Sequence, residues 1–248
     1  FLNEWTASSE KWLLGLGEIL TSALFARFLS LGACARWLNA YEFMWKNPEG
    51  EPDLQKISQI LSGVVDGTNN IYHVTQGFIC MNAEGYPDHL QRGGGDYSAT
   101  LLGAALNAKA IEIWTDINGV HNNDPRIVPG TRPIREMSYC EAAELAYFGA
   151  KILHPVCVWP AARLSIPVYL KYTMDPEAFG TLISDKAPLK GLRAIAAKDG
   201  LTIIRIRSAR MLNAYGFLRK VFEVFEDHKT PIDAITTSEV AVSLTIDN

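Results

Sequence analysis

The sequence predicts an α/β protein with a mainly parallel sheet, followed by a smaller ferredoxin-like α+β module. Strand-like and helix-like segments alternate as far as about residue 172, the pattern of parallel strands covered by helices on both faces. From about residue 190 the order becomes strand, helix, strand, strand, which begins a ferredoxin-like unit. Residues 184–191 have the composition of a linker. We therefore expect one domain at residues 1–184 and a second at residues 190–248.

The first domain opens with helical periodicity. The spacing of apolar residues predicts a helix over residues 17–31 whose core-facing side chains are Leu20, Leu24, Phe28 and Leu31. A second helix is predicted over residues 53–65. A strand over residues 71–80 and a turn-rich loop over residues 81–91 follow.

The middle of the chain carries three consecutive glycines that lead into a predicted helix over residues 97–107. A short buried strand over residues 111–114 ends at Thr115-Asp116. Ser138 and Glu141 form a capping box, which begins a helix that we expect to end near His154. Residues 166–172 return as a strand.

The second module is predicted from its own periodicity. Strands are expected over residues 201–207, 232–236 and 240–246. The helix between the first two covers residues 216–229, with core-facing side chains Phe217, Leu218, Val221, Phe222 and Phe225.

Composition excludes some classes of partner and site. With 48% hydrophobic residues, 20% charged residues and a net charge of −4, the chain gives no electrostatic reason to expect nucleic acid or a membrane as partner. The apolar stretch at residues 19–33 contains Arg27 and is too short for a bilayer, so we expect a cytoplasmic protein. The four cysteines are far apart, which predicts reduced core thiols. The chain begins without Met and ends inside a strand-like run, so we expect a fragment.

The glycine turn at residues 93–95 predicts an anion site. Glycines let backbone N–H groups approach a ligand closely, and the start of the following helix favours negative charge. Arg92 adds a planar guanidinium group, which can bind a carboxylate through two parallel hydrogen bonds. The alternative is an ordinary glycine-rich turn with Asp96 as helix N-cap. A Walker A motif is absent, because no Gly-Lys-Ser/Thr follows these glycines.

Two further elements are ambiguous on their own. Thr115-Asp116 lies at the carboxyl end of a buried strand, where ligands of open α/β sheets bind, and the next loop carries Asp124-Pro125-Arg126. That tripeptide is also an ordinary turn former. Lys151, at the end of the capped helix, could contact a ligand or could simply stabilise the negative end of the helix dipole.

Taken in order, these motifs resemble the aspartokinases of the amino-acid kinase family. The resemblance extends from about Leu14 onward and implies an α/β/α sandwich. The matching residues are Arg92-Gly93-Gly94, Asp96-Tyr97-Ser98-Ala99, Trp114-Thr115-Asp116, Gly119-Val120, Asp124-Pro125-Arg126, Glu141-Ala142-Ala143-Glu144 and residues 148–155.

The resemblance implies transfer of the γ-phosphoryl group of ATP to the side-chain carboxylate of L-aspartate, which gives 4-phospho-L-aspartate. Positioning and charge neutralisation dominate such a transfer, and Mg²⁺ would arrive with ATP rather than in a dedicated metal site. The residues implied are Arg92, Asp96 and Lys151 for catalysis; Glu18, Phe78, Arg92, Gly95 and Asp96 for the substrate; and Thr115, Asp116, His121, Arg126 and Lys151 for the nucleotide.

Three departures from the family pattern affect the site. The family's Lys-Phe-Gly-Gly-Thr segment, whose lysine contacts the phosphates, is not in this chain. Gly95 stands where a serine is usual, and His121 replaces a usual tyrosine. The histidine could equally be an ordinary exposed loop residue.

The second module resembles an ACT domain of lysine-sensitive monofunctional aspartokinases, although its closing strand is missing. The resemblance implies L-lysine as a feedback effector and a homodimer or homotetramer formed through this module. The implied effector residues are Met211, Gly216, Phe217, Leu218, Asp233, Thr237 and Ser238. Ala214 replaces a serine of such enzymes. A module that only dimerises is the alternative.

Two rival functions stay open at this point. One is another kinase of the same fold, acting on acetylglutamate, glutamate or a nucleotide. The other is an amino-acid-sensing pseudokinase. The ACT-like module and Glu18 favour aspartate phosphorylation over the first rival.

Overall fold

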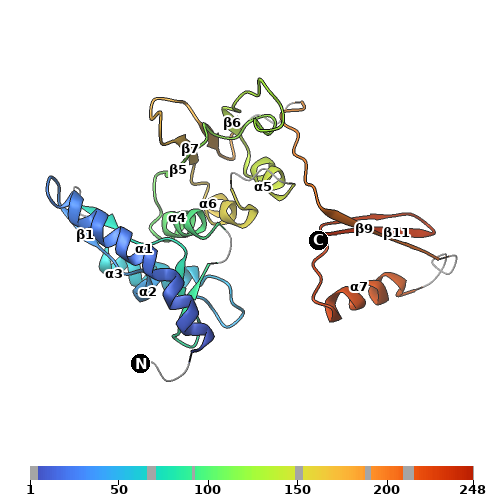
Figure 1. Cartoon of the computed structure of the whole chain (residues 1–248), viewed down its shortest axis with the longest axis horizontal. Coiled ribbons are helices and arrows are strands. Elements are labelled where there is room, and N and C mark those ends of the chain that lie inside the picture. Colours follow the sequence, from blue (N-terminus) through green and yellow to red (C-terminus); the bar gives the residue numbers. More distant parts are fainter. Residues whose placement is uncertain are drawn as a thin grey trace. The chain divides into compact units, whose positions relative to one another are not determined.

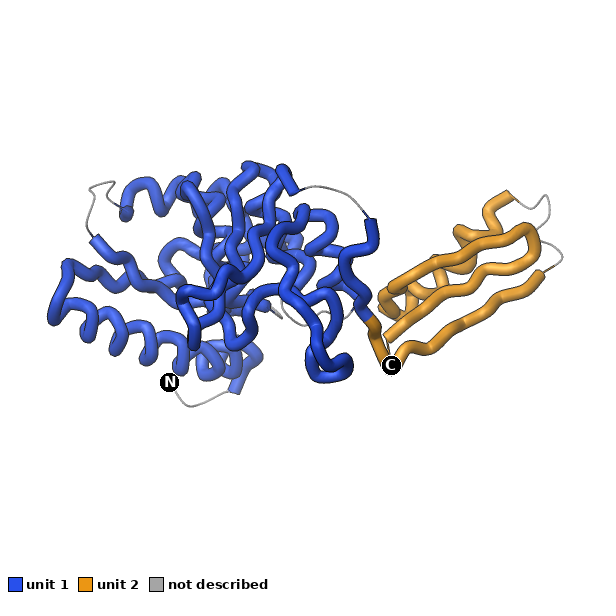
Figure 2. Tube along the Cα trace, turned by 90° about the horizontal axis from the view of Figure 1, so that it is seen from above, with its two compact units in different colours: residues 1–196 blue, residues 197–248 orange. Residues whose placement is uncertain are grey.

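The computed structural model describes residues 5–65, 71–90, 93–148, 153–187, 191–208 and 215–247. The chain divides into two compact units, unit 1 at Phe1–Ala196 and unit 2 at Ala197–Asn248 (Figure 2). The elements of unit 1 are α1 Ala7–Leu29, β1 Ala35–Trp37, α2 Ala40–Phe43, α3 Leu54–Val64, β2 Tyr72–Val74, β3 Ile79–Met81, β4 Pro87–His89, α4 Gly94–Ala105, β5 Ile111–Thr115, β6 Glu136–Met137, α5 Tyr139–Tyr147, the 3-10 helix η1 Pro155–Val158, α6 Trp159–Arg163, β7 Val168–Tyr172 and β8 Thr181–Ile183 (Figure 1).

The main sheet of unit 1 has the strand order β5-β7-β8-β6. Strand β5 is parallel to β7, β7 is antiparallel to β8, and β8 is parallel to β6. Two smaller pairs accompany this sheet: the parallel pair β1-β2 and the antiparallel hairpin β3-β4. The predicted α/β class with mainly parallel strands is confirmed.

Two hydrophobic cores lie on either side of α4. One gathers residues of β5 and β7 with residues of α5, η1 and α6. The other joins the chain around α2 to α3, β3 and Leu101 of α4. Tyr97 packs against both cores, and burial raises the pKa of its hydroxyl to about 12. Because Tyr97 of α4 packs against both cores, the glycines at the start of this helix are held in a fixed position relative to both cores.

Helix α1 departs from the prediction in length and in orientation. It starts ten residues earlier than expected, behind a capping box formed by Thr6 and Ser9. The predicted core-facing side chains Leu20, Leu24, Phe28 and Leu31 point outward and are between 66% and 75% exposed. The face that packs inward carries small residues, Gly15, Ser22 and Ala26. A side chain at Gly15 would come within 2.8 Å of Ile79 Cγ2, so the close approach of α1 to β3 requires glycine there.

The 23 residues of α1 also correct the expectation that this apolar stretch is too short for a bilayer. By length and composition alone, the helix could cross a membrane. Core helices of soluble proteins can have the same length and composition. In unit 1, the helix packs against β1, β2 and β4, and its Lys11 pairs with Asp88.

Other predictions were wrong in detail. The strand expected over residues 71–80 is two strands, β2 and β3, and the expected loop after it contains β4. The capping box of Ser138 and Glu141 is confirmed, but α5 ends at Tyr147, well before His154. Of the cysteines, Cys80 and Cys157 are buried free thiols, as predicted, while Cys34 and Cys140 are exposed.

Unit 2 contains β9 Leu201–Arg207, α7 Phe217–Asp227, β10 Ala234–Thr237 and β11 Ala241–Asp247, close to the predicted elements. Its antiparallel sheet has the order β10-β11-β9. Helix α7 packs on one face of this sheet, where Val221 meets the buried Val242 and Leu244. The predicted inward side chain Leu218 is instead 39% exposed.

Candidate functional site

Unit 1 holds two groups of candidate residues. The first, the glycine-turn site, consists of Phe78, Gly93, Gly94, Gly95 and Asp96. The second, the strand-end site, consists of Thr115, Asp116, His121 and Arg126. Arg92 and Lys151, predicted to act at these sites, lie outside the described residues, as does Met211 of unit 2.

Gly93 begins the glycine-turn site with a backbone that favours glycine. Its φ is 71°, in the left-handed region, and it is the N-cap of α4. A Cβ on Gly93 would lie 2.7 Å from Cβ of His154. Its carbonyl accepts the first helical hydrogen bond, from the Tyr97 N–H at 2.8 Å. Position 93 therefore excludes side chains for two independent reasons.

Gly94 lies against Phe78, which itself has a positive φ of 70°. The Phe78 N–H donates to the Ser98 hydroxyl oxygen at 3.1 Å and to the Gly94 carbonyl at 3.3 Å. A Cβ on Gly94 would lie 2.9 Å from Cα of Phe78. A strained backbone conformation persists only where the surrounding structure holds it. The positive φ of Phe78 therefore indicates that packing around this turn enforces its conformation.

Gly95 is different, since a Cβ there would meet nothing within 4 Å. The N–H groups of Gly94, Gly95 and Asp96 precede the first hydrogen bond of α4 and have no acceptor within the helix. An anion placed before this open turn would meet those N–H groups and the positive end of the helix dipole.

Asp96 lies in the first turn of α4 and is half-buried. The alternative interpretation of Asp96 as the N-cap is wrong, because Gly93 holds that position and no side chain caps the helix. Burial raises the pKa of the Asp96 carboxyl. In the part of the chain that the structure describes, no cation forms an ion pair with it, so its carboxylate is available to a cationic group of a ligand.

Glu18, predicted to meet the substrate ammonium, is exposed on α1, one turn after Gly15. Because Gly15 packs against Ile79, and Ile79 follows Phe78, α1 lies next to the strand that carries Phe78. The structure thus brings the element of Glu18 to the same hairpin as the glycine-turn site.

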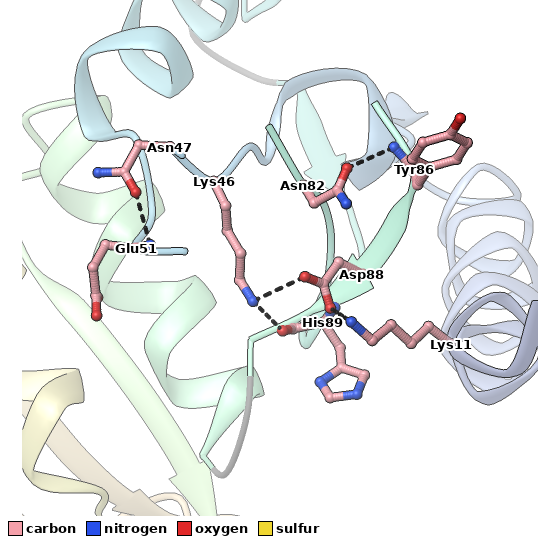
Figure 3. A network of polar contacts seen from close by, with 8 residues as sticks. All are labelled: Lys11, Lys46, Asn47, Glu51, Asn82, Tyr86, Asp88 and His89. Carbon is pink, nitrogen blue, oxygen red and sulfur yellow. Dashed lines mark hydrogen bonds and ion pairs between the residues drawn. The ribbon is translucent and has the colours of Figure 1, made fainter. Parts of the chain in front are cut away.

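A polar network that sequence reasoning missed ties α1 to this hairpin (Figure 3). Asp88 Oδ1 lies 2.7 Å from Lys11 Nζ, and Asp88 Oδ2 lies 3.2 Å from Lys46 Nζ. Burial alone would raise the pKa of Asp88, but hydrogen bonds from Lys11, from the His89 N–H and from Lys46 hold that pKa below its usual value. The three side chains come from separate segments and leave no local sequence pattern that could have predicted the network.

The strand-end site begins where β5 ends. The Thr115 hydroxyl donates to Asp116 Oδ1 at 3.1 Å, and the Thr115 carbonyl accepts from the Thr173 N–H at 2.8 Å, which holds the end of β5 beside β7. Asp116 is exposed. Its carboxylate therefore lies at the carboxyl edge of a parallel strand pair, where α/β folds bind ligands.

The loop after Asp116 carries the other two residues of this site. Arg126 is exposed and forms a bidentate ion pair with Asp124, with Nε 3.0 Å from Oδ1 and a terminal nitrogen 2.6 Å from Oδ2. The Asp124 carboxylate raises the pKa of this guanidinium. His121 Nδ1 lies 2.9 Å from the Thr131 hydroxyl. Both side chains are thus held by local partners within the loop.

The end of α4 lies beside the start of β5. Gly103, near the end of α4, packs against Ile111 at the start of β5 and leaves no room for a side chain. Because a helix that packs beside the strand following it in an α/β fold runs antiparallel to that strand, we infer that the first turn of α4 lies toward the carboxyl edge of β5. A ligand that spans this edge could contact both sites.

Unit 2 holds the described effector candidates in three places: the start of α7 and the two ends of β10. Gly216, Phe217 and Leu218 are at the start of α7, while Thr237 and Ser238 are at the end of β10, where Ser238 donates its N–H to the Ala241 carbonyl. Asp233 is at the other end of β10, where Lys198 Nζ lies 3.5 Å from its Oδ1. Phe217 packs in the core of the unit.

Metal ligands do not gather in the described part of the chain: no group of three or more His, Cys, Asp or Glu side chains that could hold a metal ion occurs there. The oxygen atoms of Thr115 and Asp116 are of the kind that Mg²⁺ prefers. They could complete the shell of an ion held mainly by a ligand.

Comparisons with known proteins agree with this geometry. The pattern of the amino acid kinase family matches residues 2–172. Lysine-sensitive aspartokinase 3 of Escherichia coli is 39% identical over 241 residues, which cover 95% of this chain and 54% of that protein. Aspartokinase 2, chloroplastic, of Arabidopsis thaliana is 36% identical over 260 residues, covering 99% of this chain and 47% of that protein. The chain therefore spans about half the length of the curated relatives it matches.

Solved structures show the same similarity. The crystal structure of E. coli aspartokinase III in complex with aspartate and ADP matches with a TM-score of 0.87 and 37% identity, covering 98% of this chain and 56% of that one. The same enzyme in complex with lysine and aspartate matches with a TM-score of 0.74 and 36% identity, with the same coverage of both chains.

Proposed function

Because this chain belongs to the amino acid kinase family, we propose that its protein transfers the γ-phosphoryl group of ATP to the side-chain carboxylate of L-aspartate. The match to an aspartokinase in complex with aspartate and ADP carries the proposal. The physical arrangement agrees, since an open helix N-terminus suited to an anion and an exposed Thr-Asp pair lie toward one edge of a sheet.

In the proposed reaction, a carboxylate oxygen of aspartate attacks the γ-phosphorus while the bond to the β,γ-bridging oxygen breaks, so ADP leaves and no proton is transferred. The protein has to hold two anions close together. At the glycine-turn site, the N–H groups of α4 and Arg92 would bind a carboxylate of the acceptor. Asp96 and Glu18 would bind its ammonium, and Phe78 would fix the floor of the pocket.

At the strand-end site, Thr115, Asp116, His121 and Arg126 would surround the nucleotide, and Lys151 would neutralise charge on its phosphates. Mg²⁺ would be bound mainly by those phosphates. The bidentate ion pair of Arg126 with Asp124 holds the guanidinium in one orientation before a nucleotide binds.

The test is an assay of the full-length protein with MgATP and a panel of acids: aspartate, glutamate, acetylglutamate and a nucleoside monophosphate. Trapping the acyl phosphate as its hydroxamate should give product with aspartate and little with the other carboxylic acids. Turnover of acetylglutamate without aspartate would reassign the acceptor. Aspartate binding without turnover would indicate a sensor instead.

We also propose that unit 2 is an ACT-type module that binds L-lysine and lowers activity, in a cytoplasmic homodimer or homotetramer. Support comes from its strand-helix-strand-strand order and from the relative solved in complex with lysine. Lysine would act by stabilising a state of low activity.

Two variants test the regulatory proposal. Ser238→Ala or Asp233→Ala should leave the uninhibited rate within about twofold and weaken inhibition by lysine about tenfold or more, an amount typical of allosteric coupling. Unchanged inhibition in both variants would place the effector elsewhere.

A further inference from the structure

The geometry points to a positioning role for the ion-pair triad Lys11–Asp88–Lys46: it fixes the Phe78 turn and helix α1 against each other and thereby sets the affinity for the acceptor acid. This inference rests on the proposed function, because it assumes that the glycine-turn site binds the acceptor. None of the three side chains is among the residues predicted to touch a substrate, so their role is indirect.

The triad joins three segments that are far apart in sequence. Lys11 lies on α1, Lys46 follows α2, and Asp88 lies on β4, as Figure 3 shows. The side chains of Lys46 and Asp88 are only 10% and 12% exposed, whereas that of Lys11 is 36% exposed. Ion pairs this buried are held with defined geometry, because either partner left alone would be an uncompensated buried charge.

One arm of the triad leads to Phe78 through His89. The Lys46 ammonium donates to the His89 carbonyl at 2.8 Å, and Asp88 Oδ1 accepts from the His89 N–H at 2.7 Å. The backbone of His89 is therefore held on both sides. Its imidazole stacks on the Phe78 ring, with 4.8 Å between centroids and 11° between planes. Since Phe78 keeps a positive φ and touches Gly94, a shift of His89 would reach the glycine-turn site directly.

The other arm leads to Glu18 through α1. Lys11 binds Asp88 one turn before Gly15, the residue that lets the helix approach Ile79. Glu18 follows one turn later on the same helix. Loss of the Lys11 pair would free the first half of α1 to shift along the hairpin, and Glu18 would move with it.

In the described part of the chain, no hydrogen bond or ion pair joins the strand-end site to the triad. Its side chains are held by partners within the site and its loop, the Thr115 carbonyl is bound by the Thr173 N–H after β7, and this region contributes to the other hydrophobic core. A defect in the triad should therefore act on the acceptor and spare the nucleotide, which a general loss of stability would not do.

Steady-state kinetics of the full-length protein with Lys11→Met test this. The substitution keeps the buried Lys46–Asp88 pair, so the protein should fold. We expect the KM for aspartate to rise about tenfold, while kcat and the KM for ATP stay within about twofold. Lys11→Arg, which can still pair with Asp88, should restore most of the loss. The matched control is Lys109→Met, a lysine that is exposed on the turn after α4 and should change nothing.

An equal change in both KM values, or an unchanged KM for aspartate, would overturn the inference. A second measurement is independent of the acceptor's identity. Amide hydrogen exchange should become faster at residues 78–90 in Lys11→Met and stay unchanged in β5. Unchanged exchange at residues 78–90 would refute the positioning role even if another acid proved to be the substrate. Failure of aspartate turnover with altered exchange would instead refute only the proposed function.

Discussion

The two halves of the proposed kinase site are built in opposite ways. Around the glycine-turn site, segments far apart in the chain pack so closely that three glycines have no room for a side chain. A Cβ at Gly15 would meet Ile79, one at Gly93 would meet His154, and one at Gly94 would meet Phe78. At the strand-end site, His121 and Arg126 lie on the loop that follows β5, and Arg126 is held by a partner only two positions away. The first site is set by long-range packing, whereas the loop half of the second is set by local contacts.

This difference matches the demands of the two ligands. A small amino acid offers few groups, so its binding depends on several protein elements held at fixed positions. A nucleotide is larger and brings a metal ion, and an exposed loop can adjust to it. Substitutions should therefore separate by ligand: packing and ion-pair changes near Phe78 should affect the acceptor, and loop changes should affect ATP.

The largest effect is expected for Arg92→Ala. Loss of the guanidinium proposed to bind the acceptor carboxylate should cost about 3 kcal/mol of transition-state stabilisation, which is about a hundredfold in kcat/KM for aspartate. The matched control is Arg132→Ala, an exposed arginine of the segment between β5 and β6. Wild-type kinetics in Arg92→Ala would remove this residue from the site.

Gly94→Ala should have the next largest effect, with Gly95→Ala as its control. A Cβ at position 94 would press on the Phe78 backbone, so we expect the free energy of unfolding to fall by about 2 kcal/mol and aspartate turnover to be nearly lost. A Cβ at position 95 meets nothing within 4 Å, so stability should change by less than about 1 kcal/mol. Denaturant unfolding measures both values. Equal stability of the two variants would contradict the close packing.

Arg126→Ala should act on the nucleotide alone and more weakly. Because the guanidinium is exposed, we expect the KM for ATP to rise about fivefold, with the KM for aspartate unchanged. Initial rates at varied ATP and saturating aspartate provide the measurement. A selective effect on aspartate would mean that the two sites are not separate.

The smallest effect concerns pH. The Asp88 pKa is lower in the folded state than in the unfolded chain, so the triad contributes stability above about pH 4 and loses it as pH falls through the folded-state pKa. The free energy of unfolding of Asp88→Asn should therefore lie furthest below wild type at neutral pH and approach it in acid. A difference that is the same at pH 7 and pH 3 would contradict this account of Asp88.

The sequence predicted what local patterns can encode. The strand that ends at Thr115, the capping box of Ser138 and the elements of unit 2 follow from periodicity and capping chemistry. The orientation of α1 does not, because the helix has an apolar stripe on one side and a face of small residues on the other. Periodicity identified the stripe at Leu20 and Leu24, but the small face around Gly15 is the one that packs.

Long-range features of the candidate site were also hidden. The glycine turn was predicted as an anion site, yet its tight fit against Phe78 depends on a positive φ at a residue type that rarely adopts one. The pairing of Asp88 with Lys11 and Lys46 joins positions 77 and 42 residues away, which no local pattern records. Contacts between residues this far apart in sequence depend on the tertiary fold, so only the structure shows them.

Binding titrations of the two arginine variants test the division of the site most directly. Aspartate and MgADP are titrated separately into full-length Arg92→Ala and Arg126→Ala by calorimetry. The account predicts a crossed result: Arg92→Ala loses affinity for aspartate and keeps MgADP, and Arg126→Ala keeps aspartate and binds MgADP more weakly. Loss of the same ligand in both variants would contradict the division into an acceptor site at the glycine turn and a nucleotide site at the strand end.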